Sequence, residues 1–144
     1  MLETALSGWQ RGLDQFLAIR TLPNPLSKTT QRYVAETGFA FFTIEAVEFL
    51  NQIGVRHLLV DVPSIDRMYD DGLLTNHHIF WNVVEGESLL KEFVWREKTL
   101  TEMIYVADEI EDGRFALNLQ IPQFKAHVAP SRPILIPIKE INHG

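Results

Sequence analysis

The hydrophobic pattern between residues 43 and 62 predicts a helix followed by a buried strand. Thr43 is suited to cap the start of the helix, and Gly54 to end it. Between them, apolar residues recur at helical spacing: Ile44, Val47, Leu50 and Ile53. Val55–Val62 contains an apolar run without polar alternation, which is typical of a buried strand. A helix that leads into a buried strand is half of a βαβ unit, so we expect an α/β fold.

The segments around this unit carry weaker patterns. Met1–Phe16 has apolar residues at helical spacing and predicts an amphipathic N-terminal helix, although Gly8 and Gly12 weaken it. Leu17–Leu22 predicts a short strand that stops at Pro23. Two further short helices are expected, over Leu74–Trp81 and Ser88–Trp95.

The last part of the chain predicts strands without helices between them. The expected strands are Leu100–Val106, Arg114–Ile121 and Pro133–Ile138. Arg114–Ile121 shows the clearest alternation of apolar and other side chains. Strands that follow one another in this way indicate an antiparallel portion within a mixed α/β fold.

Composition narrows the classes of function. The 144 residues, 46% of them hydrophobic, fit one compact domain over residues 1–144. The net charge of -6 argues against binding to nucleic acid or to an anionic membrane. No apolar window approaches the ~20 residues of a membrane helix and no signal peptide is evident, so we expect a cytoplasmic protein. Because the chain has no cysteine, any metal must be held by His and carboxylate groups.

Polar side chains gather after the buried strand. Asp61, Ser64 and Asp66 lie there, where sites form in α/β proteins. Asp61 is expected to hydrogen-bond the backbone of the following turn. A Ser-His-Asp triad of Ser64, His77 and Asp61 is disfavoured, because no G-x-S-x-G elbow surrounds Ser64.

Glu102 is the carboxylate that looks out of place. In the predicted strand Leu100–Val106 it shares a face with three aliphatic side chains. A buried carboxylate is costly unless it is paired, protonated or bound to a cation, so one interpretation is a metal ligand or an acid/base group. The other interpretation is that the opposite face of the strand is buried and Glu102 lies near an edge.

His77 and His78 are adjacent in the sequence. On a helix their side chains diverge by about 100°, and on a strand they point to opposite faces. The two rings therefore cannot easily bind one metal ion together. Either one is a ligand while the other packs or caps, or both simply belong to a polar helix start after Asn76.

Several segments together resemble the C-terminal part of the cyclase family of metal-dependent hydrolases, which includes bacterial kynurenine formamidase (arylformamidase) and isatin hydrolase. The similarity covers residues 17–138. The segments that carry it are LAIRTLPN (Leu17–Asn24), GVRHLLVDVPSIDR (Gly54–Arg67), NHHIFW (Asn76–Trp81), TLTEMIYVADEIEDGRFALNLQI (Thr99–Ile121) and PSRPILIPI (Pro130–Ile138).

This resemblance implies a swivelling β/β/α fold, a Zn or Mn site, and hydrolysis of an amide or N-formyl bond by a metal-activated water. In the family, a His from the region matching Asn76–Trp81 and a Glu from the strand matching Thr99–Val106 complete the metal site. The corresponding residues here are Glu102 and His77, with His78 as the alternate. Glu102 and His77 are also the expected catalytic residues.

The chain departs from the family pattern in one respect that matters. The N-terminal motif H-x-G-T-H-x-D-x-P-x-H, which supplies the family's main ligands, is absent, and the sequence begins near the family's midpoint. Catalytic zinc normally has about three protein ligands. We therefore expect an incomplete or shortened version of the fold, whose site is incomplete in this chain alone.

Two functions follow as expectations. The first is a hydrolase of a small-molecule amide substrate that needs metal ligands from elsewhere. The second is a non-catalytic remnant that acts as an oligomerisation or interaction module. An apolar N-terminal helix and the core surface left by a missing half both favour a homo-oligomer.

Overall fold

The computed structural model describes residues 2–36, 38–83, 97–126 and 128–138. Within the region expected to be one domain, the chain divides into two compact units, Met1–Val106 and Ala107–Gly144. None of the helices in the described residues has the length and apolar character needed to cross a membrane.

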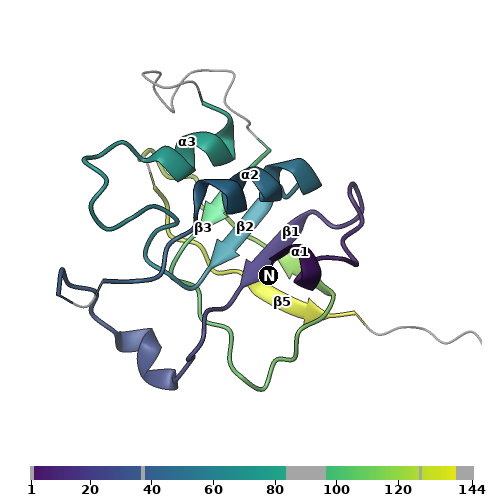
Figure 1. The fold of residues 1–144 in the computed structure, drawn as a ribbon. Coiled ribbons are helices and arrows are strands. Elements are labelled where there is room, and N and C mark those ends of the chain that lie inside the picture. Colours follow the sequence, from purple (N-terminus) through teal and green to yellow (C-terminus); the bar gives the residue numbers. More distant parts are fainter. Residues whose placement is uncertain (1, 37, 84–96, 127, 139–144) are drawn as a thin grey trace, which may run out of the picture. The chain divides into compact units, whose positions relative to one another are not determined.

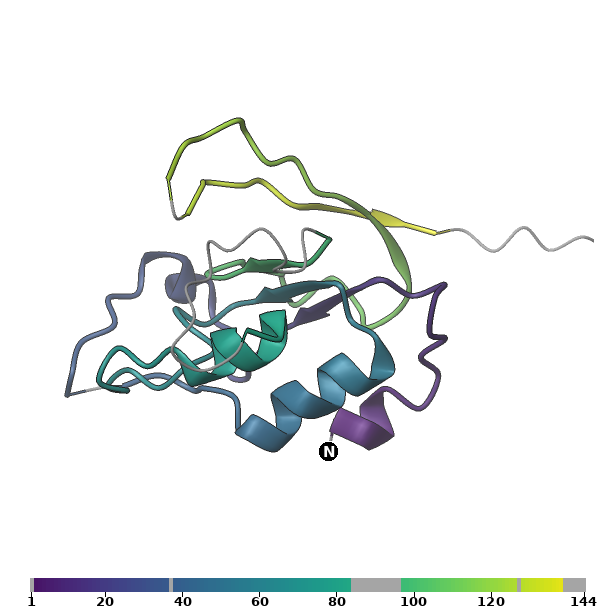
Figure 2. The same cartoon turned by 90° about the horizontal axis from the view of Figure 1, so that it is seen from above.

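The first unit is built on a three-stranded parallel sheet. Its strands are β1 (Phe16–Ile19), β2 (His57–Val60) and β3 (Thr99–Thr101), in the order β1-β2-β3 (Figure 1). In register, the central partners are Ala18, Leu59 and Thr101. Helix α2 (Ile44–Ile53) lies between β1 and β2 in the chain, and α3 (Thr75–Trp81) between β2 and β3. Both helices cover the same face of the sheet (Figure 2), which confirms the predicted α/β class.

The ends of α2 follow the sequence signals. The Thr43 hydroxyl accepts a hydrogen bond from the N–H of Ala46 at 3.2 Å and caps the first turn. Gly54 ends the helix with φ 87°, a left-handed conformation that costs little only for glycine. The predicted helix is therefore confirmed at both ends.

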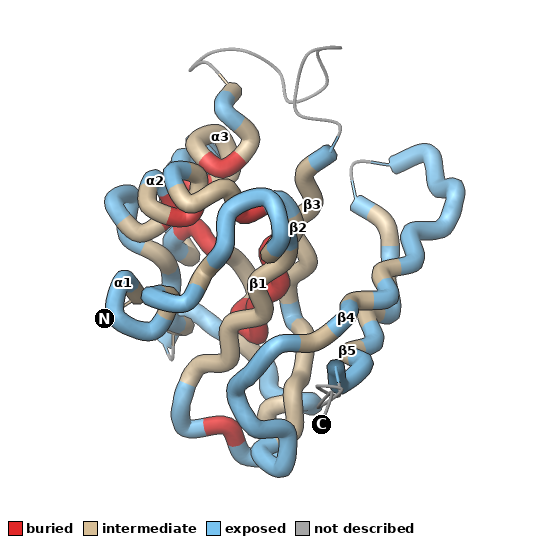
Figure 3. Tube along the Cα trace, turned by 90° about the vertical axis from the view of Figure 1, so that its right-hand side faces the viewer, coloured by how far each residue is buried: buried red, intermediate tan, exposed pale blue. Residues whose placement is uncertain are grey.

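The core lies between the two helices and the central strand. Figure 3 shows buried positions on α2, on α3 and along β2. The largest fully buried side chains are Phe80, Leu50, Leu58, Leu59, Ile65, Val47, Val55 and Val60. The predicted buried strand thus lies at the centre of the first unit. The loop after β2 therefore begins at the core.

The N-terminal helix is much shorter than predicted. Helix α1 spans only Leu2–Ala5, so the expectation of a helix over Met1–Phe16 is wrong beyond its first turn. Gly12 has φ 89°, and the Asp14 carboxylate accepts the N–H of Gln10 at 2.7 Å, so a turn replaces the helix here. A 3₁₀ helix, η1 (Leu26–Thr30), follows β1.

Strand β3 is also shorter than predicted. It ends at Thr101, so the expectation of a strand over Leu100–Val106 is wrong from Glu102 onward. Met103 takes φ 58°, which breaks the extended backbone. Glu102 therefore lies at the carboxyl end of β3 rather than on a continuous strand face. The expected helix over Ser88–Trp95 lies outside the described residues.

The second unit contains an antiparallel pair, β4 (Phe115–Asn118) and β5 (Ile134–Pro137). Leu117 pairs with Leu135 in its centre. The predicted antiparallel portion is therefore confirmed for these two strands, whereas the first of the three expected strands forms β3 and pairs parallel with β2. Among the residues described in this unit, every side chain is at least partly exposed.

Candidate functional site

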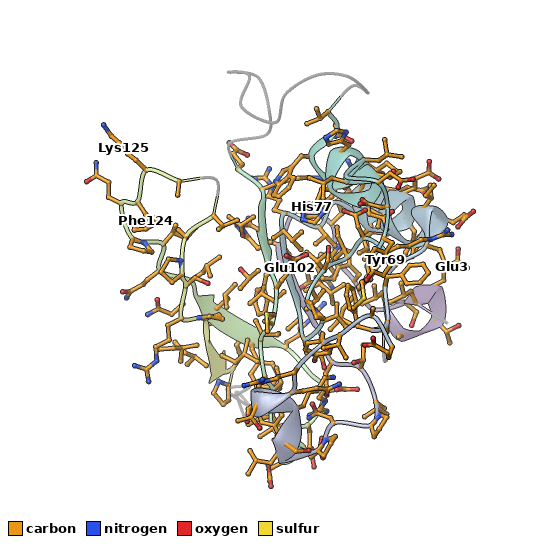
Figure 4. All side chains as sticks on the ribbon, turned by 90° about the vertical axis from the view of Figure 1, so that its left-hand side faces the viewer. Glu3, Tyr69, His77, Glu102, Phe124 and Lys125 are labelled. Atoms are coloured by element: carbon orange, nitrogen blue, oxygen red, sulfur yellow. The ribbon has the colours of Figure 1, made fainter. Side chains whose placement is uncertain are left out.

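Three segments at the carboxyl edge of the parallel sheet bring polar side chains together. Ser64 and Asp66 follow β2, Asn76 and His77 lie on α3, and Glu102 follows β3. We call these five residues the His77 cluster. His77 Nε2 lies 3.6 Å from Glu102 Oε1, and His77 Nδ1 hydrogen-bonds Asp66 Oδ2. Figure 4 shows the labelled His77 and Glu102 close to each other.

Asp66 holds both the histidine and the start of its helix. Helix α3 begins after Leu74, whose φ is 48° and whose side chain provides no cap. Asp66 Oδ1 accepts the N–H of Asn76 at 2.6 Å and so satisfies a free donor of the first turn. The N–H of Asp66 donates to Ser64 Oγ at 3.1 Å, which fixes the loop. One carboxylate thus positions the His77 ring and the helix that carries it.

Glu102 is held by the same loop. Its Oε1 accepts the N–H of Ile65 at 3.0 Å. Burial raises the pKa of Glu102 above its ordinary value, against the opposing effects of His77 and the Ile65 N–H. Burial would also raise the pKa of Asp66, but hydrogen bonds from His77 and Asn76 outweigh it and hold that pKa below its ordinary value. The two carboxylates on either side of the imidazole are therefore shifted in opposite directions.

Asn76 was not predicted as a site residue. It is buried, and its Nδ2 donates to the carbonyls of Phe42 at 2.7 Å and Ile65 at 2.8 Å. Its Oδ1 finds no hydrogen-bond partner among the described residues. Asn76 ties the segment before α2 and the loop after β2 to the helix that carries His77. The sequence signal for it was only its place directly before the His pair.

His78 does not join the cluster. Among the described parts of the chain, its ring makes no hydrogen bond or ion pair with Asp66 or Glu102. Successive helical side chains diverge by about 100°, so only one of two adjacent histidines can face the sheet edge. The His77 ring also packs near Trp81, with ring centroids 5.4 Å apart. The structure therefore brings together Glu102 and His77 of the three expected ligands.

A second polar cluster lies after β1 and β2. In this Lys28 cluster (Thr21, Lys28 and Asp61), Asp61 Oδ2 accepts from Lys28 Nζ at 2.6 Å and from the N–H of Thr21 at 2.8 Å. Lys28 Nζ also donates to Thr21 Oγ1 at 2.7 Å. The expectation that Asp61 binds the turn after its own strand is thus wrong: it binds the segment after β1. Asp61 is committed to Lys28, so the disfavoured triad with Ser64 does not form.

The His77 cluster fits a divalent metal ion in part. Two ligands about 2.0–2.1 Å from a tetrahedral zinc ion lie about 3.4 Å from each other, close to the Nε2–Oε1 distance of 3.6 Å. Imidazole and carboxylate are also donors that Zn and Mn accept. Within residues 2–36, 38–83, 97–126 and 128–138, however, no group of three His, Cys, Asp or Glu side chains is arranged to hold a metal. The cluster thus offers two suitable donors, His77 Nε2 and Glu102 Oε1.

A hollow of about 400 Å³ lies elsewhere, in the second unit. Its lining comes from Gln120, Ile121, Pro122, Pro130, Ser131 and Arg132. None of these residues belongs to the His77 cluster. The lining of the hollow includes no carboxylate and no imidazole.

Comparison with protein-family models matched no family, and comparison with curated proteins found no relative. The chemistry of this chain is therefore inferred from the residues of the His77 cluster.

Proposed function

We propose that this chain contributes His77 and Glu102 to the divalent metal site of a hydrolase that acts on an amide or N-formyl bond, of the cyclase or kynurenine formamidase type. The proposal includes the swivelling β/β/α architecture of that family. The observation that carries it is the approach of His77 Nε2 to Glu102 Oε1, while Asp66 occupies the other ring nitrogen.

The electrostatics of this approach support a cation between the two groups. A neutral imidazole that donates Nδ1–H to Asp66 presents a lone pair at Nε2. That lone pair faces the carboxylate of Glu102 at 3.6 Å. Two acceptors at this distance repel each other unless a proton or a metal ion lies between them. A metal ion satisfies both acceptors at once, and it supplies a cation beside the partly buried Glu102 carboxylate.

Each residue then has a defined part in the reaction. A bound divalent ion supplies Lewis acidity, which activates water and polarises an amide carbonyl. His77 and Glu102 hold it, Asp66 orients the His77 ring, and the N–H of Ile65 fixes Glu102. The remaining ligands come from another chain. We therefore expect weak or no hydrolysis of N-formylkynurenine by the chain alone.

Zn²⁺ titration by calorimetry tests this proposal. We expect binding by the full chain, and a loss of at least tenfold in affinity in His77→Gln and in Glu102→Gln. His78→Gln is the matched control, because it removes an adjacent imidazole that lies outside the cluster, and its affinity should equal that of the wild type. Equal Zn²⁺ affinity in the wild type, His77→Gln and Glu102→Gln contradicts the proposal.

An interaction module is the second candidate, and the antiparallel unit favours it. Ile134 and Ile136 of β5 are 47% and 48% exposed, on a two-stranded ribbon that has little stability by itself. Such a ribbon gains stability when a second chain covers it. Sedimentation of the wild type and of Ile134→Lys/Ile136→Lys tests this function. It predicts an oligomer that the double substitution dissociates, and a monomeric wild type excludes it.

A further inference from the structure

We propose that Asp66 is a positioning residue that selects the tautomer of His77. It holds the single proton of the neutral ring on Nδ1 and so leaves Nε2 as the atom that faces Glu102. The part of this inference that concerns a metal rests on the proposed function above, whereas the tautomer itself does not.

The hydrogen bonds of Asp66 show that it acts as an acceptor toward the His77 ring. Its Oδ1 accepts the backbone N–H of Asn76, which is a donor only, so this oxygen is already committed. Its Oδ2 faces His77 Nδ1 and accepts from it. The Asp66 side chain is 4% exposed, so water does not compete for these positions. An ionised carboxylate can only accept hydrogen bonds, so its contact with Nδ1 requires the ring proton on that nitrogen.

His57 provides a contrast within the same chain. Its Nδ1 lies 2.9 Å from the hydroxyl of Thr99. A hydroxyl can donate or accept, so this contact does not select a tautomer. Among the histidines in the described residues, only His77 has an Nδ1 that hydrogen-bonds a carboxylate. The same carboxylate also positions the start of α3, so ring orientation and tautomer are set together.

Asp66→Asn tests the inference with almost no change in shape. The side-chain oxygen still accepts the N–H of Asn76, but the amide NH₂ group now faces His77 Nδ1. Because NH₂ can only donate, Nδ1 must accept and the ring proton moves to Nε2. Nitrogen NMR of the metal-free full chain, at a pH where the ring is neutral, reports which nitrogen carries the proton. The His77 signals are assigned by their loss in His77→Gln.

Asp70→Asn is the matched control. It removes the same charge from the loop before α3, where Asp70 accepts from the N–H groups of Gly72 and Leu74. We expect Nδ1–H in the wild type and in Asp70→Asn, and Nε2–H in Asp66→Asn. A wild-type ring with its proton on Nε2 overturns the inference whether or not the variants fold. An unchanged tautomer in folded Asp66→Asn overturns it as well.

Zn²⁺ affinity provides a second readout. Loss of the acceptor behind a ligating histidine typically costs about 10–100-fold in metal affinity, so we expect this loss in Asp66→Asn and none in Asp70→Asn. Wild-type protein that binds no Zn²⁺ contradicts the proposed function, and the NMR result still decides the role of Asp66. Zn²⁺ binding that is lost in Glu102→Gln but unchanged in folded Asp66→Asn supports the proposed function and overturns the inference.

Discussion

Two carboxylates that follow neighbouring strands, Asp61 after β2 and Glu102 after β3, have opposite surroundings. Asp61 in the Lys28 cluster meets a cation, and the three N–H donors of Lys28 have three acceptors: Asp61 Oδ2, Thr21 Oγ1 and Thr21 O. In the His77 cluster, a ring nitrogen and the Glu102 carboxylate face each other at 3.6 Å. A buried acid therefore does not by itself mark a site. The difference lies in the partner: Asp61 faces an ammonium group, whereas Glu102 faces an imidazole.

Exposure separates the two clusters in the same sense. The side chains of Asp61 and Lys28 are 0% and 10% exposed, whereas those of His77 and Glu102 are 14% and 26% exposed. The Lys28–Asp61 ion pair links the segment after β1 to the end of β2. The partly exposed pair can be reached from solvent. This contrast supports a structural role for the Lys28 cluster and the proposed metal-binding role of the His77 cluster.

The largest expected effect is a loss of stability when the ion pair of the Lys28 cluster is removed. Lys28→Met leaves Asp61 buried without its cation, and removal of one partner of such a pair typically costs about 3–5 kcal/mol. Urea denaturation should show this loss in the free energy of unfolding. Asp61→Asn added to Lys28→Met should recover part of it. A loss below about 1 kcal/mol would show that solvent or another group compensates Asp61.

Zn²⁺ should stabilise the protein, and we expect it to do so through the His77 cluster alone. At a free concentration about 100 times the dissociation constant, a ligand that binds only the folded state stabilises it by about 2.7 kcal/mol. We expect this gain in the wild type and in Lys28→Met, and its absence in Glu102→Gln. Denaturation with and without Zn²⁺ measures it. An equal gain in Glu102→Gln would place the Zn²⁺ site elsewhere on the chain.

The sequence predicted what depends on neighbouring residues. The cap at Thr43, the left-handed end at Gly54 and the buried strand before Asp61 all follow from local signals. The length of β3 could not be predicted from local signals, because it depends on pairing with β2, and this pairing ends at Thr101. Glu102 was found as a candidate by its residue type, although the strand face used to argue for it is not formed.

The partners of the clusters could not be predicted in the same way. The bonds from Lys28 to Asp61 and from Ile65 to Glu102 join segments that are distant in the sequence. Asp66 was noted only as one of several polar residues after a strand, and Asn76 only as a helix start. Their roles arise when the carboxyl ends of the strands meet at one edge of the sheet. Residue type thus identifies candidates, and topology selects among them.

Asn76→Ala should have an intermediate effect on stability and reduce Zn²⁺ binding. It removes the donor that the carbonyls of Phe42 and Ile65 share. The Ile65 carbonyl keeps the N–H of Phe42, but the Phe42 carbonyl loses its bond to Asn76, and such a loss typically costs about 1–3 kcal/mol. Because the Ile65 peptide also holds Glu102, Zn²⁺ affinity should fall even where the protein remains folded. Reduced stability with unchanged Zn²⁺ affinity would show that Asn76 supports the fold but does not position His77 and Glu102.

The smallest expected effect is on the pH dependence of stability in the metal-free protein. Burial raises the folded-state pKa of Glu102 above its ordinary 4.5, so the unfolded chain loses this proton first as the pH rises. The contribution of Glu102 is therefore present below pH 4.5 and is lost as the pH rises through the folded-state pKa. The lowered pKa of Asp66 acts in the opposite direction, below its ordinary 3.8.

The difference between the free energies of unfolding of the wild type and Glu102→Gln, measured between pH 4.5 and 7, isolates the Glu102 contribution, because the lowered pKa of His57 acts in both proteins. Glu102→Gln should lack this decline, while Glu48→Gln on the exposed side of α2 should retain it. Parallel curves for the wild type and Glu102→Gln would mean that ionisation of Glu102 is not opposed by its surroundings. The contrast with Asp61 would then be one of geometry alone, because a carboxylate that ionises freely does not require a cation beside it.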